Sequence, residues 1–195
     1  MLTGNLVRLR AIEMEDLDRY LAWVNDEEVV QYIATSAPHP VSRAQEEEWL
    51  RRAMTHTVPP EITYAIETLD DGRHIGSVSL HGVGGSERKA SLGVLIGDKT
   101  CWSRGFGTDA ITVMLRHAFE ELNLNRVSLE VHDFNARAIA CYRKCGFVEE
   151  GRLRQDRYRH GEYGDTLIMG VLREEFRAKR ASSPPNPLSL RGEGA

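Results

Sequence analysis

The glycine-containing stretch CWSRGFGTDA, residues 101–110, has a composition and position that suggest anion binding. It follows the apolar run SLGVLIG at 91–97 and leads into a helical pattern that begins at Thr108. Free backbone N–H groups at a helix N-terminus and the helix dipole favour an anion, and glycines permit close approach. Arg104 adds positive charge, although Asp109 in the first turn adds negative charge. The stretch is therefore a candidate pyrophosphate cradle.

Two other interpretations of this stretch remain open. Gly105 and Gly107 could serve the turn alone, because glycine adopts positive φ without steric cost. The letters GFGTDA also match G-x-G-x-x-A, with Glu130 twenty residues after Ala110, as in dinucleotide-binding folds. In that fingerprint the glycines follow the first strand directly, whereas eight residues, GDKTCWSR, precede Gly105 here. The sequence contains no Gly-Lys-Ser/Thr, so it has no P-loop motif.

Composition and charge restrict the function classes. Cys141 and Cys145 lie four residues apart with no second pair and no histidine cluster near them, so we predict no metal site. A formal net charge of −4 argues against a nucleic-acid partner. The apolar runs are far shorter than the ~20 residues that a membrane helix needs. The N-terminal segment MLTGNLVRLR lacks the features of a signal peptide, so we expect a cytoplasmic protein without membrane association.

The glycine turn must be positioned by alternating strands and helices. Period-2 and period-3.6 patterns predict strands at 5–10, 62–69, 74–83, 91–97 and 125–132, a final hairpin over 147–172, and helices at 13–25, 27–34, 42–54, 108–122, 135–144 and 173–180. Asp71-Gly72 between two strands indicates a hairpin turn, and Ser42 with Gln45 indicates a capping box. The nearly continuous apolar run at 91–97 suggests a strand buried on both faces.

These elements predict an α+β protein. A helix at 108–122 that crosses between the strands at 91–97 and 125–132 favours one parallel pair in an otherwise antiparallel sheet. We expect a mixed sheet of about seven strands flanked by helices, in a single domain over residues 1–181. The remaining residues, 182–195, are rich in Pro, Ser and Gly and are expected to form a disordered tail.

Two motifs together resemble the GNAT N-acetyltransferase superfamily. Its loop pattern Gln/Arg-x-x-Gly-x-Gly/Ala falls on 102–107, with Trp102 in place of Gln or Arg. Its second pattern matches at Asn135, Ala138, Tyr142, Lys144, Gly146 and Phe147. The segments LVRLRAIEMEDLDRYLAWVNDEEV and EGRLRQDRYRHGEYGDTLIMGVL resemble the branch with ribosomal-protein alanine and serine N-acetyltransferases and spermidine acetyltransferase. The resemblance covers about residues 3–173.

The resemblance implies acetyl-CoA as cosubstrate and assigns roles to residues. The backbone of Leu95, Ile96 and Gly97 would bind the pantetheine arm and the thioester carbonyl. The pyrophosphate would lie on the loop formed by Trp102, Ser103, Arg104, Gly105, Phe106, Gly107 and Thr108. Asn135 would contact pantetheine, and the hydroxyl of Tyr142 would donate a proton to the departing thiolate. Asn135 and Tyr142 are seven residues apart, so they share a helix face with ~10 Å between them.

The proton acceptor is not identified by the resemblance. Relatives in this branch often carry Glu where this chain has Ser91, and serine is a poor base. A water relay, Glu130 or His132 could deprotonate the amine. No Cys/His pairing indicates a covalent nucleophile, so attack would be direct.

The leading expectation is an enzyme that acetylates a primary amine. The amine would be a small molecule or a peptide: a protein N-terminus, a polyamine or another small amine. Helices within 13–55 and the turn at 158–165 would line its site. A homodimer could form through an exposed final strand. The main alternative is a non-catalytic acyl-CoA-binding sensor, motivated by Ser91 and Trp102, and a weaker one is a non-enzymatic dinucleotide-binding protein.

Overall fold

Strands and helices follow one another along the chain in the predicted order. The computed structural model describes residues 2–33, 40–55, 61–159 and 161–182, so residues 183–195 of the predicted tail lie outside the described residues. The strands are β1 (Leu2–Thr3), β2 (Val7–Arg10), β3 (Glu61–Thr68), β4 (His74–His81), β5 (Lys89–Ile96), β6 (Arg126–His132), β7 (Val148–Arg159) and β8 (Glu162–Leu172). The helices are η1 (Met14–Asp16), α1 (Leu17–Val24), α2 (Glu27–Val30), α3 (Arg43–Thr55), η2 (Lys99–Cys101), α4 (Phe106–Arg116), η3 (His117–Glu121), α5 (Ala136–Cys145) and α6 (Arg173–Ser182).

The described strands form one mixed sheet in the order β1-β2-β3-β4-β5-β6-β8-β7. The pair β5 and β6 is parallel, and the other neighbours are antiparallel. The expected fold class is therefore confirmed, with eight strands instead of about seven because Leu2–Thr3 adds a short edge strand. We had expected the final strand to be exposed at the sheet edge. Instead β8 lies between β6 and β7, so the edge strand is β7.

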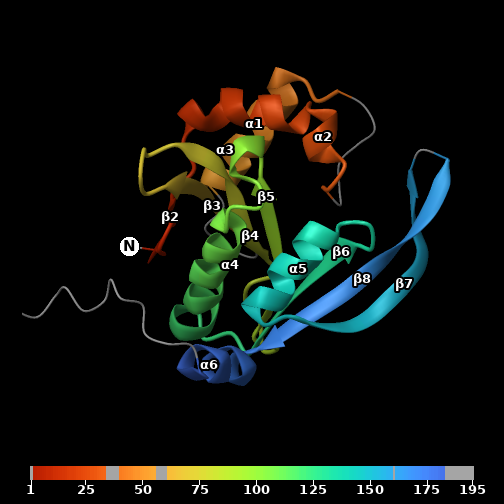
Figure 1. The fold of residues 1–195 in the computed structure, drawn as a ribbon. Coiled ribbons are helices and arrows are strands. Elements are labelled where there is room, and N and C mark those ends of the chain that lie inside the picture. Colours follow the sequence, from red (N-terminus) through yellow and green to blue (C-terminus); the bar gives the residue numbers. More distant parts are fainter. Residues whose placement is uncertain (1, 34–39, 56–60, 160, 183–195) are drawn as a thin grey trace, which may run out of the picture.

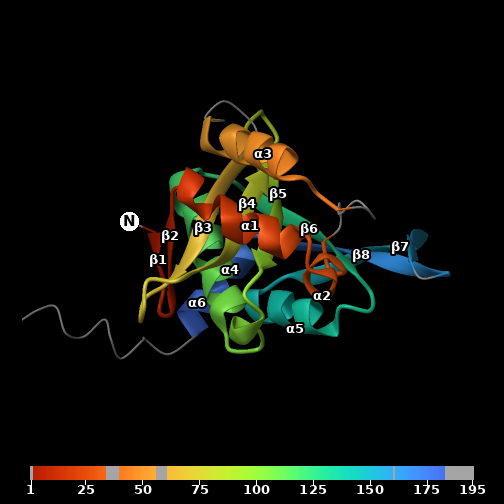
Figure 2. The same cartoon turned by 90° about the horizontal axis from the view of Figure 1, so that it is seen from above.

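Helices cover both faces of the sheet (Figures 1 and 2). On one face, α4, α5 and α6 pack onto the main apolar core, which includes Val78, Leu92, Ile111, Leu129 and Phe176. On the other face, α1 and α3 enclose a smaller cluster built on Tyr20, Leu50 and Ala65. The hairpin of β7 and β8 extends away from this body as a long arm (Figure 1).

Local signals in the sequence have the expected structures. The chain turns at Asp70–Gly72 between β3 and β4, and Gly72 has a φ of +67°. At the start of α3, the backbone N–H of Gln45 donates to Ser42 Oγ (3.3 Å) and the N–H of Ser42 donates to Gln45 Oε1 (2.9 Å). These reciprocal bonds are those of a capping box, which satisfies N–H groups that the helix leaves unpaired.

The prediction that β5 is buried on both faces is wrong. Ser91 is exposed, and Val94, Leu95 and Ile96 are only half-buried. The apolar pattern is real, but the second half of β5 separates from its parallel neighbour. Its side chains and backbone therefore line a cavity.

Candidate active site

A fork in the sheet creates the site. The parallel register between β5 and β6 covers Lys89–Ser91 opposite Arg126–Ser128. Beyond it, β5 stays paired with β4 through Ile96, while β6 stays paired with β8 through His132. The backbone N–H groups of Gly97 and Asp98 donate to the carbonyl of Ile75 (2.9 and 3.2 Å), which holds the end of β5 on β4. The two strands therefore diverge along the second half of β5.

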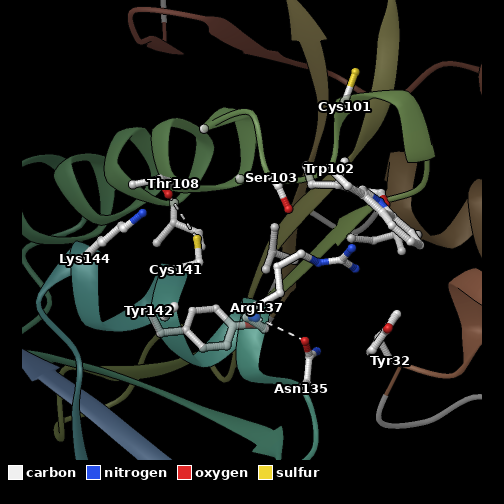
Figure 3. Close-up of a pocket in the computed structure, with 18 of the residues that line it drawn as sticks. Tyr32, Cys101, Trp102, Ser103, Thr108, Asn135, Arg137, Cys141, Tyr142 and Lys144 are labelled. Atoms are coloured by element: carbon white, nitrogen blue, oxygen red, sulfur yellow. Dashed lines mark hydrogen bonds between the residues drawn. The ribbon is translucent and has the colours of Figure 1, made fainter.

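A cavity of about 430 Å³ lies along this divergence. It is bounded by β5, the loop before α4, the first turn of α4, α5 and residues of α2 and its C-terminal turn (Figure 3). Its walls include Val94, Leu95, Ile96, Trp102, Ser103, Gly105, Gly107, Thr108, Asn135, Arg137, Cys141, Tyr142 and Lys144. The β5 wall is thus apolar, and the remaining walls present helix termini and cations.

The glycine turn directs the N-terminus of α4 toward this cavity. Ser103 and Gly105 have φ values of +60° and +91°, and α4 begins at Phe106. Gly107 lies within the first turn, where an added Cβ would stand 3.6 Å from Ile96 and 3.9 Å from the sulfur of Cys141. Gly105 thus serves the turn, whereas a Cβ at Gly107 would be in ordinary van der Waals contact with β5 and α5. Unpaired N–H groups of the first turn face an anion-sized space.

Asp109 does not oppose an anion in the cavity, because its carboxylate is used elsewhere. It accepts the backbone N–H groups of Asn5 (3.1 Å), Leu6 (2.7 Å) and Val7 (3.0 Å). A Cβ on Gly4 would lie 2.3 Å from the same carboxylate. Asp109 therefore fixes the turn between β1 and β2 to the start of α4, and three backbone N–H groups direct its carboxylate there.

Trp102 has a structural task at the position where Gln or Arg was expected. Its indole Nε1 donates to the carbonyl of Ile96 (2.7 Å) at the end of β5. The guanidinium of Arg137 lies 3.8 Å from the Trp102 ring and 4.9 Å from the Tyr32 ring. The two rings meet edge-on at 6.0 Å. Trp102 thereby positions an arginine of α5 over the cavity (Figure 3).

Helix α5 contributes Asn135 and Tyr142. Asn135 is the N-cap, with its Oδ1 accepting the N–H of Ala138 (3.1 Å), which leaves its amide N–H₂ group for another partner. Tyr142 is 8% exposed and lines the cavity, and its ring meets Phe147 edge-on. Burial raises the pKa of Tyr142, so the phenol stays protonated at neutral pH. The structure therefore presents a protonated hydroxyl at this wall.

Cys141 also lines the cavity. Its sulfur lies 3.2 Å from Thr108 Oγ1. A hydrogen bond with Cys145 lowers the pKa of Cys141 to about 7, and Thr108 acts in the same direction. The hydrogen bond with Cys141, together with burial, raises the pKa of Cys145. Of the two thiols, Cys141 is therefore the more acidic.

Three expected binding residues do not line the cavity. Gly97 is covered by Trp23, whose ring a Cβ would meet at 2.0 Å. Arg104 turns outward, with Nη1 donating to the carbonyl of Thr100 (3.2 Å) and the guanidinium 5.4 Å from the Phe106 ring. Phe106 itself is buried in the main core. Trp23 thus covers the Gly97 backbone, and the side chains of Arg104 and Phe106 have partners away from the cavity.

Sequence reasoning missed three cavity residues that carry charge or aromatic surface. Arg137 and Lys144 of α5 supply the cations expected from Arg104, and Tyr32 follows α2. Lys144 was part of the matched motif, so its position gave a signal. Tyr32 had none, because only the tertiary fold brings it to Trp102.

The candidate proton acceptors occupy different environments. His132 is buried, and the guanidinium of Arg157 lies 3.1 Å from its Nδ1 and 2.7 Å from its Nε2. Burial and the charge of Arg157 lower the pKa of His132. Glu130 and Ser91 are exposed. Among the described residues, no group of three or more His, Cys, Asp and Glu side chains is arranged to hold a metal ion. The helices within the described ranges are too short or too polar to cross a membrane.

Comparison with known proteins identifies the family. Residues 7–148 match the model of the acetyltransferase (GNAT) domain. The chain is 34% identical over 112 residues to a putative ribosomal N-acetyltransferase, YdaF, of Bacillus subtilis, covering 57% of this chain and 61% of that protein. It is 26% identical over 179 residues to spermidine N(1)-acetyltransferase of Escherichia coli K12, covering 92% of both.

Solved structures agree with this assignment. The crystal structure of spermidine N-acetyltransferase from Vibrio cholerae in complex with CoA and spermine superposes with a TM-score of 0.78 at 27% identity, covering 88% of this chain and 98% of that one. The forked sheet, the turn before α4 and the matching domain model lead to one conclusion: the chain belongs to the GNAT acetyltransferase family, as an acetyl-CoA-dependent enzyme.

Proposed function

We propose that the protein transfers the acetyl group of acetyl-CoA to a primary amine, with the cavity between β5, α4 and α5 as the acetyl-CoA site. The observation that carries this proposal is the fork, which leaves the second half of β5 facing a cavity with a helix N-terminus at one end and Tyr142 in its wall. A long ligand with anionic groups and a thioester fits such a site. The apolar residues of β5 and the polar residues of α4 and α5 suit a pantetheine arm that lies between them.

The charges of the cavity support placement of the CoA phosphates near α4. The N–H groups of the first turn of α4 and the guanidinium of Arg137 face the same space, and Lys144 adds a second cation. Helix N-termini and guanidinium groups are suited to phosphate oxygens. Asn135 offers its amide N–H₂ group to a pantetheine carbonyl. In this arrangement Trp102 replaces a polar loop side chain by holding Arg137.

The reaction proceeds by direct attack. The neutral amine forms a C–N bond to the thioester carbonyl, and collapse of the tetrahedral intermediate breaks the C–S bond. Tyr142, kept protonated by burial, gives its proton to the departing thiolate and regains one from the amine nitrogen through solvent. The products are the N-acetyl amine and CoA.

The substrate is a cationic amine in this proposal. Named relatives include spermidine acetyltransferases and a putative ribosomal N-acetyltransferase, so polyamines and protein N-termini both belong in a first panel. Calorimetric titration with acetyl-CoA, with NADH as a control, tests the binding site first. Thiol release in the presence of the amine panel then tests transfer. Absence of acetyl-CoA binding would overturn the proposal.

The alternative considered from the sequence, a non-catalytic acyl-CoA sensor, was motivated by Ser91, which is exposed and offers no carboxylate. The two candidates differ in one result: a sensor binds acetyl-CoA and acetylates no amine.

A further inference from the structure

A connected polar group lies on the sheet face opposite the acetyl-CoA cavity. Cross-strand pairing places Glu61 opposite His81 and His81 opposite Ser91, and the next pairs place Thr63 opposite Ser79 and Ser79 opposite Gly93. Directly paired residues share a face, and these alternate with the core residues Val78, Leu80 and Leu92. The group is therefore directed away from α4 and α5, toward the face that α1 and α3 cover only in part.

The side chains of this group form a continuous chain of contacts. His81 Nε2 lies 2.8 Å from Ser79 Oγ, and His81 Nδ1 lies 3.4 Å from Glu61 Oε1. Thr63 Oγ1 donates to the same Glu61 oxygen (3.3 Å), which orients the carboxylate. A carboxylate at Nδ1 favours the imidazole tautomer with its proton there, so Nε2 is free to accept the hydroxyl proton of Ser79.

Ser79 and His81 pack directly over the bare backbone of Gly93. A Cβ at that position would lie 2.8 Å from Ser79 Oγ and 3.2 Å from His81 Nε2. Any side chain there would displace the serine and the histidine. Gly93 therefore lets the hydroxyl and the imidazole meet against the strand, and the His81 side chain, 47% exposed, is reached from solvent.

Gly93 places the Glu61–His81–Ser79 contacts at the point where β5 and β6 diverge. The last parallel pair of the fork is Ser91 opposite Ser128, so Gly93 is the next residue of β5 on this face after the strands diverge. Val94 and Leu95, which follow it, line the acetyl-CoA cavity. The Glu61–His81–Ser79 chain thus stands at the fork, across the sheet from the α4 and α5 side.

We propose that Glu61, His81 and Ser79 form the proton-accepting relay for the amine substrate, which is a primary alkylammonium. This inference rests on the acetyl transfer proposed above. The ammonium gives one proton to Ser79 Oγ as the serine proton passes to His81 Nε2. The products are the neutral amine, an imidazolium and an unchanged serine. The carboxylate of Glu61 stabilises the imidazolium, which returns its proton to solvent after transfer.

This assignment explains how the protein can deprotonate an amine although residue 91 is a serine. His81 is the direct cross-strand partner of Ser91, so the base is moved one strand sideways at the same level of the sheet. The other candidates are less suitable. His132 is already against the Arg157 guanidinium, and Glu130 is an exposed single carboxylate on the adjacent strand.

The relay also has a defined charged surrounding. Glu61 faces His81 from β3, and Arg52 of α3 lines a shallow cavity together with Glu61, Trp49 and Ala53. Arg52 lies 3.8 Å from Glu48 of its own helix. At the start of β5, Lys89 is paired with Glu87. Of the carboxylates named, Glu48 and Glu87 are each matched by a cation, and Glu61 faces His81.

The test compares His81→Gln, Ser79→Ala and Glu61→Gln with the wild type, using the best amine of the panel. The matched control is Glu87→Gln, which also removes one exposed carboxylate but lies outside the relay. At neutral pH we expect kcat/KM of His81→Gln to fall about 10²-fold or more, since this is the range of general base contributions. Acetyl-CoA affinity by calorimetry should not change in any variant, because the relay lies on the other face.

The pH dependence separates a base from a structural residue. As the pH approaches the amine's own pKa, about 8 for an α-amine and about 10.4 for a lysine-like amine, more substrate is already neutral. The loss in His81→Gln should then shrink. A kcat/KM equal to wild type at neutral pH, or a loss that is the same at every pH, would overturn the relay alone. A wild type that binds acetyl-CoA but acetylates no amine would overturn the acetyl transfer as well.

Discussion

The indole Nε1 of Trp102 donates to the carbonyl of Ile96 at 2.7 Å, and the Arg137 guanidinium lies over the same indole ring at 3.8 Å. One side chain thus ties the end of β5 to the loop before α4 and fixes a cation above the cavity. A cation held on an aromatic face contributes on the order of 1–2 kcal/mol when it is partly desolvated.

Replacement of Trp102 by alanine should weaken acetyl-CoA binding by about tenfold, because Arg137 loses its platform. Trp102→Phe keeps a ring but not the donor and should fall between alanine and wild type. Calorimetric titration measures both. Equal affinities for wild type and Trp102→Ala would show that Arg137 does not act through the indole.

Asp109→Asn should destabilise the fold without removing the cofactor site. The carboxylate accepts three backbone N–H groups of the turn between β1 and β2, and hydrogen bonds to a charged group contribute about 1.5–3 kcal/mol. We expect the free energy of unfolding, measured with urea, to drop by about 2 kcal/mol. The control is Asp18→Asn, which breaks the exposed pair with Arg43 and should change stability by less than about 1 kcal/mol.

Tyr142→Phe should lower kcat about 10²-fold or more and leave the acetyl-CoA dissociation constant unchanged, because the phenylalanine keeps the packing against Phe147 and loses the proton. Steady-state rates with calorimetry in parallel measure the two quantities. A variant as active as wild type would remove Tyr142 from the proton-donor role. The same experiment addresses the sensor alternative, for which there is no rate to lose.

Asp16 should make the fold sensitive to acid. Burial disfavours its charge, but Arg10 donates to both carboxylate oxygens (2.8 and 2.7 Å), His74 adds a contact at 3.0 Å, and together they hold the pKa of Asp16 well below its ordinary value. A lowered native pKa stabilises the fold above the unfolded value of about 3.9, and that contribution is lost as the pH falls below it.

Urea titrations at about pH 6 and about pH 3 measure this contribution through the fall in the free energy of unfolding. Asp16→Asn should be less stable at the higher pH and show a smaller fall between the two. An identical pH dependence in wild type and variant would assign the acid sensitivity to other carboxylates.

The arm of β7 and β8 is a candidate self-association surface. Tyr158 and Tyr163 near its tip are 67% and 66% exposed and contact each other at 5.0 Å, and β7 is an edge strand. Exposed aromatic pairs on a free edge favour association. We expect a homodimer by size-exclusion chromatography with light scattering, and a shift to monomer in Tyr158→Ser. A monomeric wild type would contradict this expectation.

The sequence by itself determined the order of elements, the parallel crossover around α4 and the glycine turn at its start. These follow from hydrophobic period, turn residues and spacing, which are local properties of the chain. The matched motifs also pointed to Asn135 and Tyr142 as neighbours on one helix face. Local patterns succeeded there because the cavity wall is built from a single strand–turn–helix unit and the helix that follows.

Only the tertiary structure decided which way charged side chains turn. Arg104, next to the glycines, points outward, whereas Arg137, thirty-three residues later, lies over the cavity on Trp102. Asp109 serves a turn one hundred residues away in the chain, and β5 looked buried because period alone cannot reveal that its neighbour diverges. The contacts of Glu61 with His81, and of His81 with Ser79, depend on strand register and side-chain geometry, which no local pattern encodes.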